Sequence, residues 1–477
     1  MENTKNMENT ENKINRTMVG DLPQMAGKEV MVCGWVQTIR THGKIMFFDL
    51  RDRTGVVQAV FIPKNKDFEL AKTVRSEWVV AITGMVQERP ANMVNAEIAT
   101  GKIELFATGL EVYSEAETLP FPIDNDGYDI SEEHRLKYRY LDLRRQRLSQ
   151  NISFRHKINN FIRHFLTKQN FIEIDTPYIT RSTPEGARDF LVPSRLQPGK
   201  FFALPQSPQQ YKQLLMVAGL ERYFQLARCF RDEDTRGDRQ PEFTQLDMEM
   251  SFMNQEEIMA LNENLLIELV KELCPEKKIQ QIPFPRISYQ EAQKLYQTDR
   301  PDIRKNKNDQ NELAFCWVVD FPFFEKDEKD GWTFTHNPFS APKSEFMADL
   351  LSKNNIAKIM ATQYDIVLNG EEIGGGSIRN HNIEALKSVF EIMNVGHIEE
   401  NFGHIFEAFS YGAPPHGGIA WGIDRLMMIL KNEPNIREMI AFPKTGDGQD
   451  LMMKAPSGVS DEQLKELGIA IIEKNKK

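Results

Sequence analysis

Short runs of alternating hydrophobic and polar residues fill the first quarter of the chain. Such runs predict β-strands, and a charged, helix-compatible stretch at residues 67–75 follows the third of them. The five predicted strands are residues 29–36, 45–50, 56–62, 78–84 and 103–113. Five short strands with one helix after the third are typical of a small Greek-key barrel of the OB type, although generic β meanders share this count. We therefore expect a barrel over residues 16–113.

Beyond the predicted barrel, the pattern changes to that of a larger domain. Residues 114–131 are rich in Pro, Gly and Asn, which predicts a linker. From residue 132 onward, helical periodicity alternates with strand-like runs, and residues 254–274 predict an amphipathic helix. The polar run at residues 304–311 is too hydrophilic for a core and predicts a surface loop. We expect a large α+β domain over residues 132–477.

Composition excludes several classes of protein. The 477 residues are 40% hydrophobic and 27% charged, which suits two or three ordered domains, and no apolar run reaches the roughly 18 to 20 residues of a membrane helix. Because the net charge is -10, nucleic acid would have to be bound by local basic patches. Residues 1–15 resemble no targeting signal and are predicted to be a frayed tail. The cysteines lack C-x-x-C spacing for zinc and fit a reducing cytoplasm; they are Cys33, Cys229, Cys274 and Cys316.

The densest charge cluster in the chain, residues 230–245, lies between two strand-like runs. A charge run of this kind is usually the solvated tip of a hairpin. Here, however, polar side chains occupy one whole face of the second strand, and a polar sheet face in a large domain can line a pocket as well as meet bulk water. The residues on that face are Phe243, Gln245, Asp247, Glu249 and Ser251.

The sequence of this cluster, FRDEDTRGDRQPEFTQ, resembles motif 2 of class II aminoacyl-tRNA synthetases in the form typical of bacterial aspartyl-tRNA synthetases. Residues 154–180, which contain IDTP, resemble motif 1, and GGIAWGIDRL at residues 417–426 resembles motif 3. Three shorter segments resemble the same family: residues 183–189, 206–212 and 374–379. The resemblance covers residues 28–470. It implies an OB-fold anticodon-binding domain, followed by a class II catalytic domain built on an antiparallel sheet flanked by helices.

The resemblance implies an ATP site with two catalytic arginines. Activating an amino acid brings its α-carboxylate against the α-phosphate of ATP, so a cation shared by the two anions is needed. Arg231 matches the family's arginine in that role, Glu233 the residue that meets adenine, and Arg425 the arginine that holds the γ-phosphate. The ATP set is completed by Gln240 and Glu372.

A magnesium site is suggested by two carboxylates on either side of Asn369-Gly370. A hairpin at this dipeptide would bring Asp365 and Glu372 to one mouth of the pocket, and hard oxygen ligands beside phosphates suit Mg²⁺. Without the resemblance, two acidic residues at this spacing would more often be exposed side chains of a hairpin. The family places magnesium and ATP at the matching positions.

The resemblance also implies a site for L-aspartate. Arg379 and Lys212 match the two cations that bind the substrate's side-chain carboxylate in aspartyl enzymes, and a buried arginine without its anion is costly. The positions around the substrate's ammonium group are matched by Glu185, Gln209 and Asp247. His336 is expected to face the same pocket, although many relatives have a second histidine where this chain has Asn337. Residues 374–376, three glycines, would more often form a turn; before Arg379 they would let the backbone approach the ligand.

The residues that match the family's tRNA contacts fall in the barrel and in the charge cluster. Phe47 and Gln58 match the anticodon-reading pair, and because Phe47 and Phe48 are adjacent, only one of them can face the barrel interior. Residues 40–53 contain two more basic than acidic residues, and Arg40 is one of the basic residues predicted to contact the tRNA. The remaining predicted tRNA contacts are Arg236 and Arg239 at the acceptor end, and His42 and Asn92 in the barrel.

The resemblance leaves the range of tRNA partners open. His42 and residues 89–95 resemble those of enzymes that aspartylate tRNA(Asn) as well as tRNA(Asp), a product that a tRNA-dependent amidotransferase would then convert. The alternative is an enzyme strict for tRNA(Asp), in which His42 is only a loop residue. Other readings are a lysyl or asparaginyl enzyme, a synthetase-like binding protein, or a tRNA-independent amide-forming enzyme. The family's usual insertion between motifs 2 and 3 is missing.

The resemblance further implies a homodimer. Motif 1 in this class forms a long helix and a strand at the subunit interface. We expect the apolar face of that helix to supply the contact, together with Pro177. The predicted interface residues of the helix are Ile158, Phe161, Ile162 and Phe165.

Overall fold

The computed structural model describes residues 15–182, 186–327 and 330–472. The chain divides into two compact units between Pro122 and Ile123. The predicted tail at residues 1–15 lies almost wholly outside the described residues. Among the helices that the structure describes, none is long and apolar enough to cross a membrane. Each unit is described by itself below.

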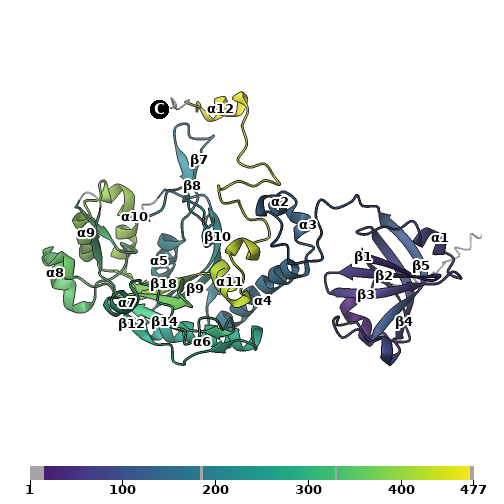
Figure 1. Ribbon diagram of the computed structural model, residues 1–477. Coiled ribbons are helices and arrows are strands. Elements are labelled where there is room, and N and C mark those ends of the chain that lie inside the picture. The colour runs from purple at the N-terminus through teal and green to yellow at the C-terminus, as the bar shows by residue number, and fades with distance from the viewer. Residues whose placement is uncertain (1–14, 183–185, 328–329, 473–477) are drawn as a thin grey trace, which may run out of the picture. The chain divides into compact units, whose positions relative to one another are not determined.

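The first unit is a closed five-stranded barrel, as the sequence predicts (Figure 1). Its strand order is β1-β2-β3-β5-β4, and a short parallel pairing of β3 with β5 closes it. Because the tight turn at Gly43 pairs His42 directly with Ile45, the first strand is longer than predicted. The elements are β1 (Glu29–His42), β2 (Ile45–Asp52), β3 (Gly55–Phe61), β4 (Val79–Glu88) and β5 (Ile103–Ser114), with η1 (Val19–Gln24) and η2 (Ala91–Met93).

The helix predicted at residues 67–75 is only one turn long, α1 (Phe68–Ala71). Asp67, just before it, accepts a hydrogen bond from the Leu110 backbone N–H at 2.9 Å, which ties the segment to β5. The Thr73 hydroxyl donates to the Leu70 carbonyl, so the chain turns away from the helix. The Thr73 bond is a local side-chain-to-backbone bond of the kind that competes with helix propagation, whereas the Asp67 bond holds the start of the segment against a distant strand. The helix therefore lies where it was predicted, but it is shorter than predicted.

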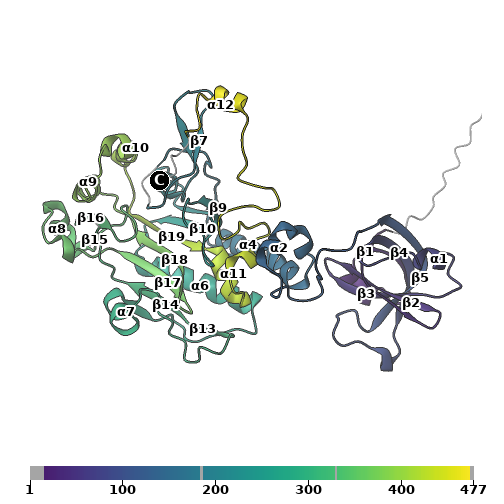
Figure 2. The ribbon, with the colours of Figure 1, turned by 45° about the horizontal axis from the view of Figure 1, so that its top comes forward.

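The second unit is built on one large sheet (Figure 2), whose strand order is β12-β14-β17-β18-β19-β10-β9-β6. The central pairs are antiparallel, and only the two outermost pairs, β12 with β14 and β6 with β9, are parallel. The predicted hairpin around the charge cluster is present as β9 and β10. The strands are β6 (Ile172–Glu173), β9 (Arg222–Phe230), β10 (Glu242–Ser251), β12 (Arg286–Ser288), β14 (Phe315–Val319), β17 (Gln363–Leu368), β18 (Glu371–Ile378) and β19 (His416–Gly422).

Helices α4, α6 and α11 pack on one face of this sheet and form the main core with it. The predicted helix at residues 254–274 is confirmed as α6, whose N-terminus is set by a capping box at Asn254 and Glu257. The predicted surface loop at residues 304–311 contains no helix or strand. The helices are α2 (Glu132–Lys137), α3 (Arg139–Asp142), α4 (Gln146–Lys168), α5 (Gln209–Val217), α6 (Gln255–Leu273), α7 (Tyr289–Tyr296), α8 (Met347–Ser352), α9 (Ile383–Ile392), α10 (Ile398–Ser410), α11 (Ile423–Lys431) and α12 (Asp461–Leu467).

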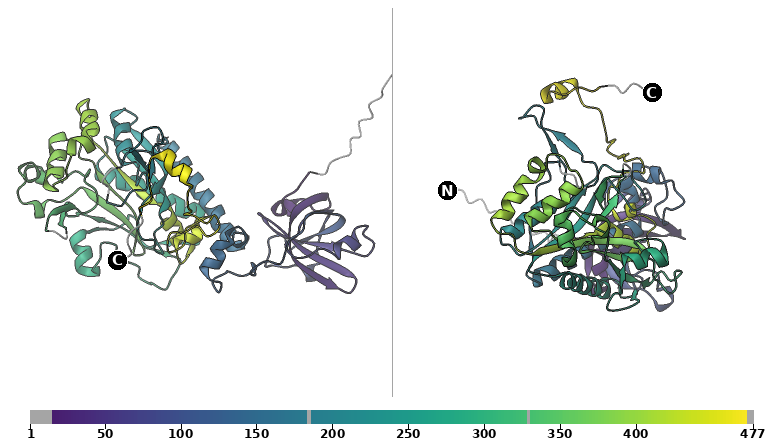
Figure 3. Two further views of the ribbon diagram at one scale, coloured as in Figure 1. Left: turned by 90° about the horizontal axis from the view of Figure 1, so that it is seen from above. Right: turned by 90° about the vertical axis from the view of Figure 1, so that its left-hand side faces the viewer.

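Smaller elements surround the sheet. Figure 3 shows α9 and α10 side by side, and the rings of Phe390 and Phe402 stack between them at 4.1 Å. Helix α5 packs against β9 and β10 on the face opposite the main core. The short strands and turns are β7 (Leu191–Pro193), β8 (Phe201–Ala203), β11 (Lys278–Ile279), β13 (Glu312–Leu313), β15 (Phe324–Lys326), β16 (Trp332–Phe334), η3 (Ser344–Phe346), η4 (Ile356–Lys358) and η5 (Ile436–Met439).

The apolar face of α4 does not form the predicted subunit contact. Ile158, Ile162 and Phe165 are buried in the core of their own chain, and Phe161 packs against that core. The 3.6-residue period identifies a buried helix face but cannot tell what buries it. The prediction that this face meets a second subunit is therefore wrong.

Candidate active site

A cavity of about 340 Å³ opens on the polar face of the large sheet. Side-chain alternation along β10 directs Leu246, Met248 and Met250 into the core, so Asp247 and Glu249 point to the opposite face. The structure brings together five residues predicted to bind the amino acid: Gln209 and Lys212 from α5, Asp247 from β10, His336, and Arg379 just after β18. The sixth, Glu185, lies outside the described residues.

Two buried cations and two carboxylates form a network at one end of this cavity. Lys212 Nζ lies 3.0 Å from Asp247 Oδ2 and 3.2 Å from Glu249 Oε2. Arg379 donates to both carboxylate oxygens of Glu249, at 2.9 and 3.0 Å, and to the Ser377 hydroxyl at 2.8 Å. Since an ammonium has three N–H donors and a guanidinium five, these bonds leave donors of both cations available to an anionic ligand.

Glu249 was not among the predicted site residues. The sequence placed Glu249 on the polar face of β10. Its role could not be predicted, because its partner Arg379 lies 130 residues further along the chain. Burial would raise the pKa of Glu249, but Arg379 and Lys212 outweigh this effect and lower the pKa to about 2. Glu249 is therefore a permanent anion that keeps both cations in place.

Asp247 differs from Glu249 in its electrostatic environment. Burial raises the pKa of Asp247 to about 6, even though Lys212 acts in the opposite direction. Its Oδ1 atom is buried and has no hydrogen-bond partner among the described residues. A buried carboxylate oxygen without a donor suits a positively charged ligand group.

A second cavity, of about 220 Å³, adjoins the first. Four residues line both cavities: Arg231, Glu233, Gln245 and Glu372. The guanidinium of Arg231 lies over the Phe243 ring at 5.1 Å, and its Nε is buried without a hydrogen-bond partner in the described part of the chain. Arg425, from α11, lines only the second cavity. The predicted ATP residues thus gather around one space, with Arg231 at its junction with the other.

The loop between β9 and β10 contacts the predicted ATP residues. Asp238 pairs with Arg425 at 3.1 Å, and Arg239 pairs with Glu233 at 3.3 Å. Gln240, predicted to bind ATP, uses its side-chain amide to bond the backbone of Lys444: its Oε1 accepts at 2.7 Å and its Nε2 donates at 3.2 Å. Gln240 therefore also anchors this loop to the segment after α11.

The two predicted magnesium ligands flank the expected hairpin. Asn369 and Gly370 both have positive φ and connect β17 to β18. A Cβ atom on Gly375 would lie 2.7 Å from Asp365 Oδ1 and 3.7 Å from Glu372 Oε1, so both carboxylates reach the same point. Burial raises the pKa of Asp365 to about 7, and Glu372 adds to this rise. Glu372 lines both cavities, whereas Asp365 is buried behind it and lines neither. Two crowded carboxylates fit a divalent cation, although no cluster of three or more His, Cys, Asp or Glu occurs in the described residues.

The three glycines at residues 374–376 lie inside strand β18 and not in a turn. A Cβ on Gly376 would lie 2.2 Å from the Gly418 carbonyl oxygen, and one on Gly374 would lie 2.7 Å from the Trp421 ring. Only glycine allows this close packing of β18 against β19. Gly375 and Gly376 line the first cavity, so the predicted approach of the backbone to the ligand stays a prediction for these two residues.

The barrel presents its predicted RNA contacts on its outer surface. Phe48 is fully buried, so Phe47 faces outward, as the alternation requires. Arg40 donates to Asp49 at 2.8 Å and to Gln58 Oε1 at 3.3 Å. His42 and Asn92 are exposed, as are Arg236 and Arg239 in the second unit.

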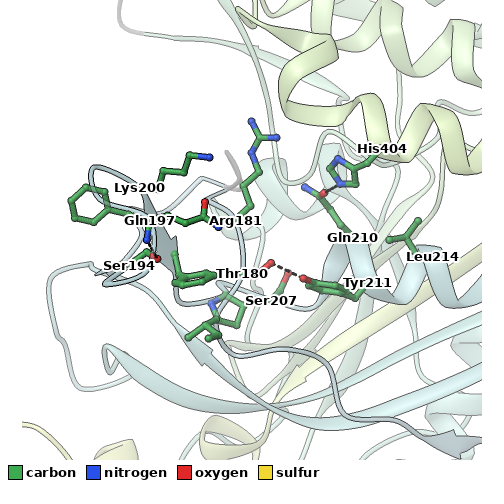
Figure 4. A pocket seen from close by; sticks show the side chains of 14 residues that line it. Thr180, Arg181, Ser194, Gln197, Lys200, Ser207, Gln210, Tyr211, Leu214 and His404 are labelled. Carbon is green, nitrogen blue, oxygen red and sulfur yellow. Dashed lines mark hydrogen bonds between the residues drawn. The ribbon is translucent and has the colours of Figure 1, made fainter. Parts of the chain in front are cut away.

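A further cavity, of about 500 Å³, lies beside the first and shares Ser207 with it (Figure 4). The Thr180 and Tyr211 hydroxyls meet across it at 2.7 Å, and His404 Nε2 lies 2.5 Å from Gln210 Oε1. None of the predicted site residues that the structure describes lines this cavity. Its size alone does not make it the substrate site.

Comparison with known proteins identifies the family. The model for tRNA synthetases class II (D, K and N) matches residues 131–446, and the model for the OB-fold nucleic acid binding domain matches residues 30–113. Since the first match spans more than half of the chain, the chain belongs to the class II tRNA synthetases of the D, K and N group. The predicted barrel type and catalytic fold are both confirmed.

Two relatives extend over nearly the whole chain. An aspartate–tRNA(Asp/Asn) ligase of Thermoanaerobacter pseudethanolicus is 41% identical over 590 aligned positions, covering 96% of this chain and 99% of its own. The ligase of the same name from Endomicrobium trichonymphae is 40% identical over 582 positions, covering 95% and 99%. Both alignments are longer than the 477 residues of this chain. The relatives therefore carry residues that it lacks, which agrees with a lost insertion.

Solved structures share the fold at lower identity. The asparaginyl-tRNA synthetase of Pyrococcus horikoshii with asparaginyl-adenylate has a TM-score of 0.72 at 24% identity, covering 91% of this chain and 98% of its own. The aspartyl-tRNA synthetase of Entamoeba histolytica has a TM-score of 0.70 at 22% identity, covering 91% and 92%. At this level of identity, these similarities show only a shared fold.

Proposed function

We propose that this protein is an aspartate–tRNA ligase, which activates L-aspartate with ATP and transfers it to the 3′ end of tRNA. The observation that carries this proposal is the position of Arg231 where the two cavities meet. A cation there can neutralise both the α-carboxylate of the amino acid and the α-phosphate of ATP. Lys212 and Arg379 line only the first of the two cavities, and Arg425 lines only the second.

The remaining residues take roles that follow from their chemistry. Lys212 and Arg379 bind the side-chain carboxylate, and Asp247 with Gln209 binds the ammonium group, joined by Glu185. Arg425 holds the γ-phosphate and Glu233 the adenine. Mg²⁺, held by Asp365 and Glu372, would neutralise phosphate charge when bound. Relatives named aspartate–tRNA(Asp/Asn) ligase support aspartate as the amino acid.

The choice of aspartate over related substrates rests on charge. The Lys212 ammonium and the Arg379 guanidinium are nearly completely buried. An asparagine amide would leave part of this positive charge unmatched, and a lysine side chain would add to it. The lysyl and asparaginyl alternatives are thereby disfavoured.

ATP–pyrophosphate exchange tests the proposed function. The exchange should depend on L-aspartate and should be at least about tenfold slower with L-asparagine or L-lysine at equal concentration, because a site built for a charged group rejects analogues strongly. Exchange that proceeds equally well with asparagine would contradict the assignment of Arg379 and Lys212.

We propose that the enzyme charges both tRNA(Asp) and tRNA(Asn). The similarity of His42 and the segment around Asn92 to relaxed enzymes supports this, as do the relatives' names. The two tRNAs differ at the last anticodon base, so relaxing one contact, worth about 1 to 3 kcal/mol, suffices. Purified transcripts of both tRNAs should be aspartylated at rates within about two orders of magnitude. A thousandfold preference for tRNA(Asp) would show that the enzyme is strict for tRNA(Asp). If both tRNAs are charged, the host requires an amidotransferase to convert the aspartylated tRNA(Asn).

We further propose a homodimer that uses the edge of the large sheet. Strand β6 is one of the two edge strands; Ile172 on it is 48% exposed, and Tyr178 and Ile179, which follow it beside Pro177, are 43% and 55% exposed. Exposed apolar side chains along a sheet edge favour association with a second copy. Sedimentation at micromolar concentration should give twice the 55.1 kDa of the chain, and Ile179→Asp should lower this mass. A monomer that retains exchange activity would exclude the interface.

A further inference from the structure

The loop between β9 and β10 forms ion pairs with two residues of the proposed ATP site. Arg425 Nη2 lies 3.1 Å from Asp238 Oδ2, and Arg239 Nη1 lies 3.3 Å from Glu233 Oε2. Each pair contains one proposed ATP ligand, but Glu233 belongs to the loop itself, so only the pair with Arg425 on α11 joins the loop to another element. The first pair is the more shielded from solvent, with exposed fractions of 21% for Arg425 and 26% for Asp238.

We propose that Asp238 competes with the γ-phosphate of ATP for Arg425. The inference rests on the proposed function, which assigns Arg425 to the γ-phosphate. A carboxylate and a phosphate are both anions and repel one another when they approach the same cation closely. ATP binding therefore displaces Asp238 from the guanidinium, and the apparent affinity for ATP is reduced by the strength of the ion pair.

Asp238 is a competitor and does not position Arg425, because Arg425 has a second anchor. Its Nη1 donates to the backbone carbonyl of Glu372, on strand β18. This bond does not involve the loop, so it keeps the guanidinium aimed into the cavity when Asp238 leaves. Loss of the Asp238 carboxylate therefore frees donors of Arg425 without misplacing them.

The rest of the loop stays in place when Asp238 moves. The Gly237 carbonyl accepts from the Ile436 backbone N–H at 3.0 Å, and the Arg236 carbonyl accepts from Arg437 Nη1 at 3.1 Å. Displacement is thus confined to the Asp238 side chain, between Arg236 and Arg239. Since these two arginines are the proposed acceptor-end contacts, ATP occupancy changes the charge presented to the tRNA.

Equilibrium titration with ATP in the presence of Mg²⁺ and without aspartate tests the proposal. Asp238→Asn keeps the size of the side chain but removes its charge, and it should bind ATP about two- to fivefold more tightly than the wild type, the range expected for a partly exposed ion pair. The affinity for AMP, which has no γ-phosphate, should not change. A variant that only disturbed the fold would weaken ATP binding instead.

Asp234→Asn is the matched control. Asp234 lies on the same loop and lines the same cavity, but it forms no ion pair within the described residues. Unchanged or weaker ATP binding by Asp238→Asn, an equal gain for AMP, or an equal gain in Asp234→Asn would each overturn the proposal. Wild-type enzyme that binds ATP but shows no aspartate-dependent exchange would refute the proposed function and leave this test valid.

Discussion

Replacing Arg231 with alanine should slow aspartate-dependent ATP–pyrophosphate exchange by about a hundredfold or more. One donor that stabilises transition-state charge is typically worth roughly 2.7 to 4 kcal/mol. Arg231 is the only positively charged residue that lines both cavities among the described residues.

The variant should remain folded, because Arg231 leaves no partner unsatisfied. Within the described residues it contributes a cation–π contact with Phe243 but no ion pair. Thermal unfolding should therefore be close to that of the wild type. Arg228→Ala is a suitable control, since Arg228 lies on β9, three residues before Arg231, and pairs with Glu242 outside the two cavities. A loss of less than about tenfold in Arg231→Ala, or an equal loss in the control, would remove Arg231 from its proposed role.

Local sequence signals predicted the elements of the fold well where the determinants are also local. The helix at residues 254–274 has its caps at both predicted ends. The adjacent Phe47 and Phe48 point to opposite faces of β2, as the strand period demands. The length predicted for the helix at residues 67–75 was wrong. Asp67 accepts a hydrogen bond from Leu110, a partner on a distant strand that no local pattern reveals.

Long-range pairing also explains what sequence reasoning missed in the site. Asp247 and Lys212 were predicted individually, but Glu249, which binds Lys212 and Arg379 together, was not. The same holds for Asp238, whose contact with Arg425 joins residues 187 positions apart. The resemblance supplied ligand-binding residues, whereas the ion pairs that hold them depend on the assembled sheet.

Replacing Arg379 with alanine should raise the aspartate concentration needed for half-maximal exchange by at least about thirtyfold, with little change in the requirement for ATP. Arg379 lines the first cavity but not the second, so only the amino acid should be affected. Removing one partner of a buried, hydrogen-bonded charge pair typically costs about 2 to 5 kcal/mol. An equal rise for both substrates would mean that the site had collapsed.

Stability complicates this variant, because Glu249 would keep a buried charge beside Lys212 alone. Breaking a buried pair in this way destabilises a protein by about 3 to 5 kcal/mol. The double variant Arg379→Ala with Glu249→Gln removes that charge, so its melting temperature should recover toward that of the wild type. Its aspartate requirement should stay high, because the guanidinium that recognises the side-chain carboxylate is still missing. A folded double variant with a normal aspartate requirement would show that Lys212 alone recognises the substrate carboxylate and that Arg379 serves only to neutralise Glu249.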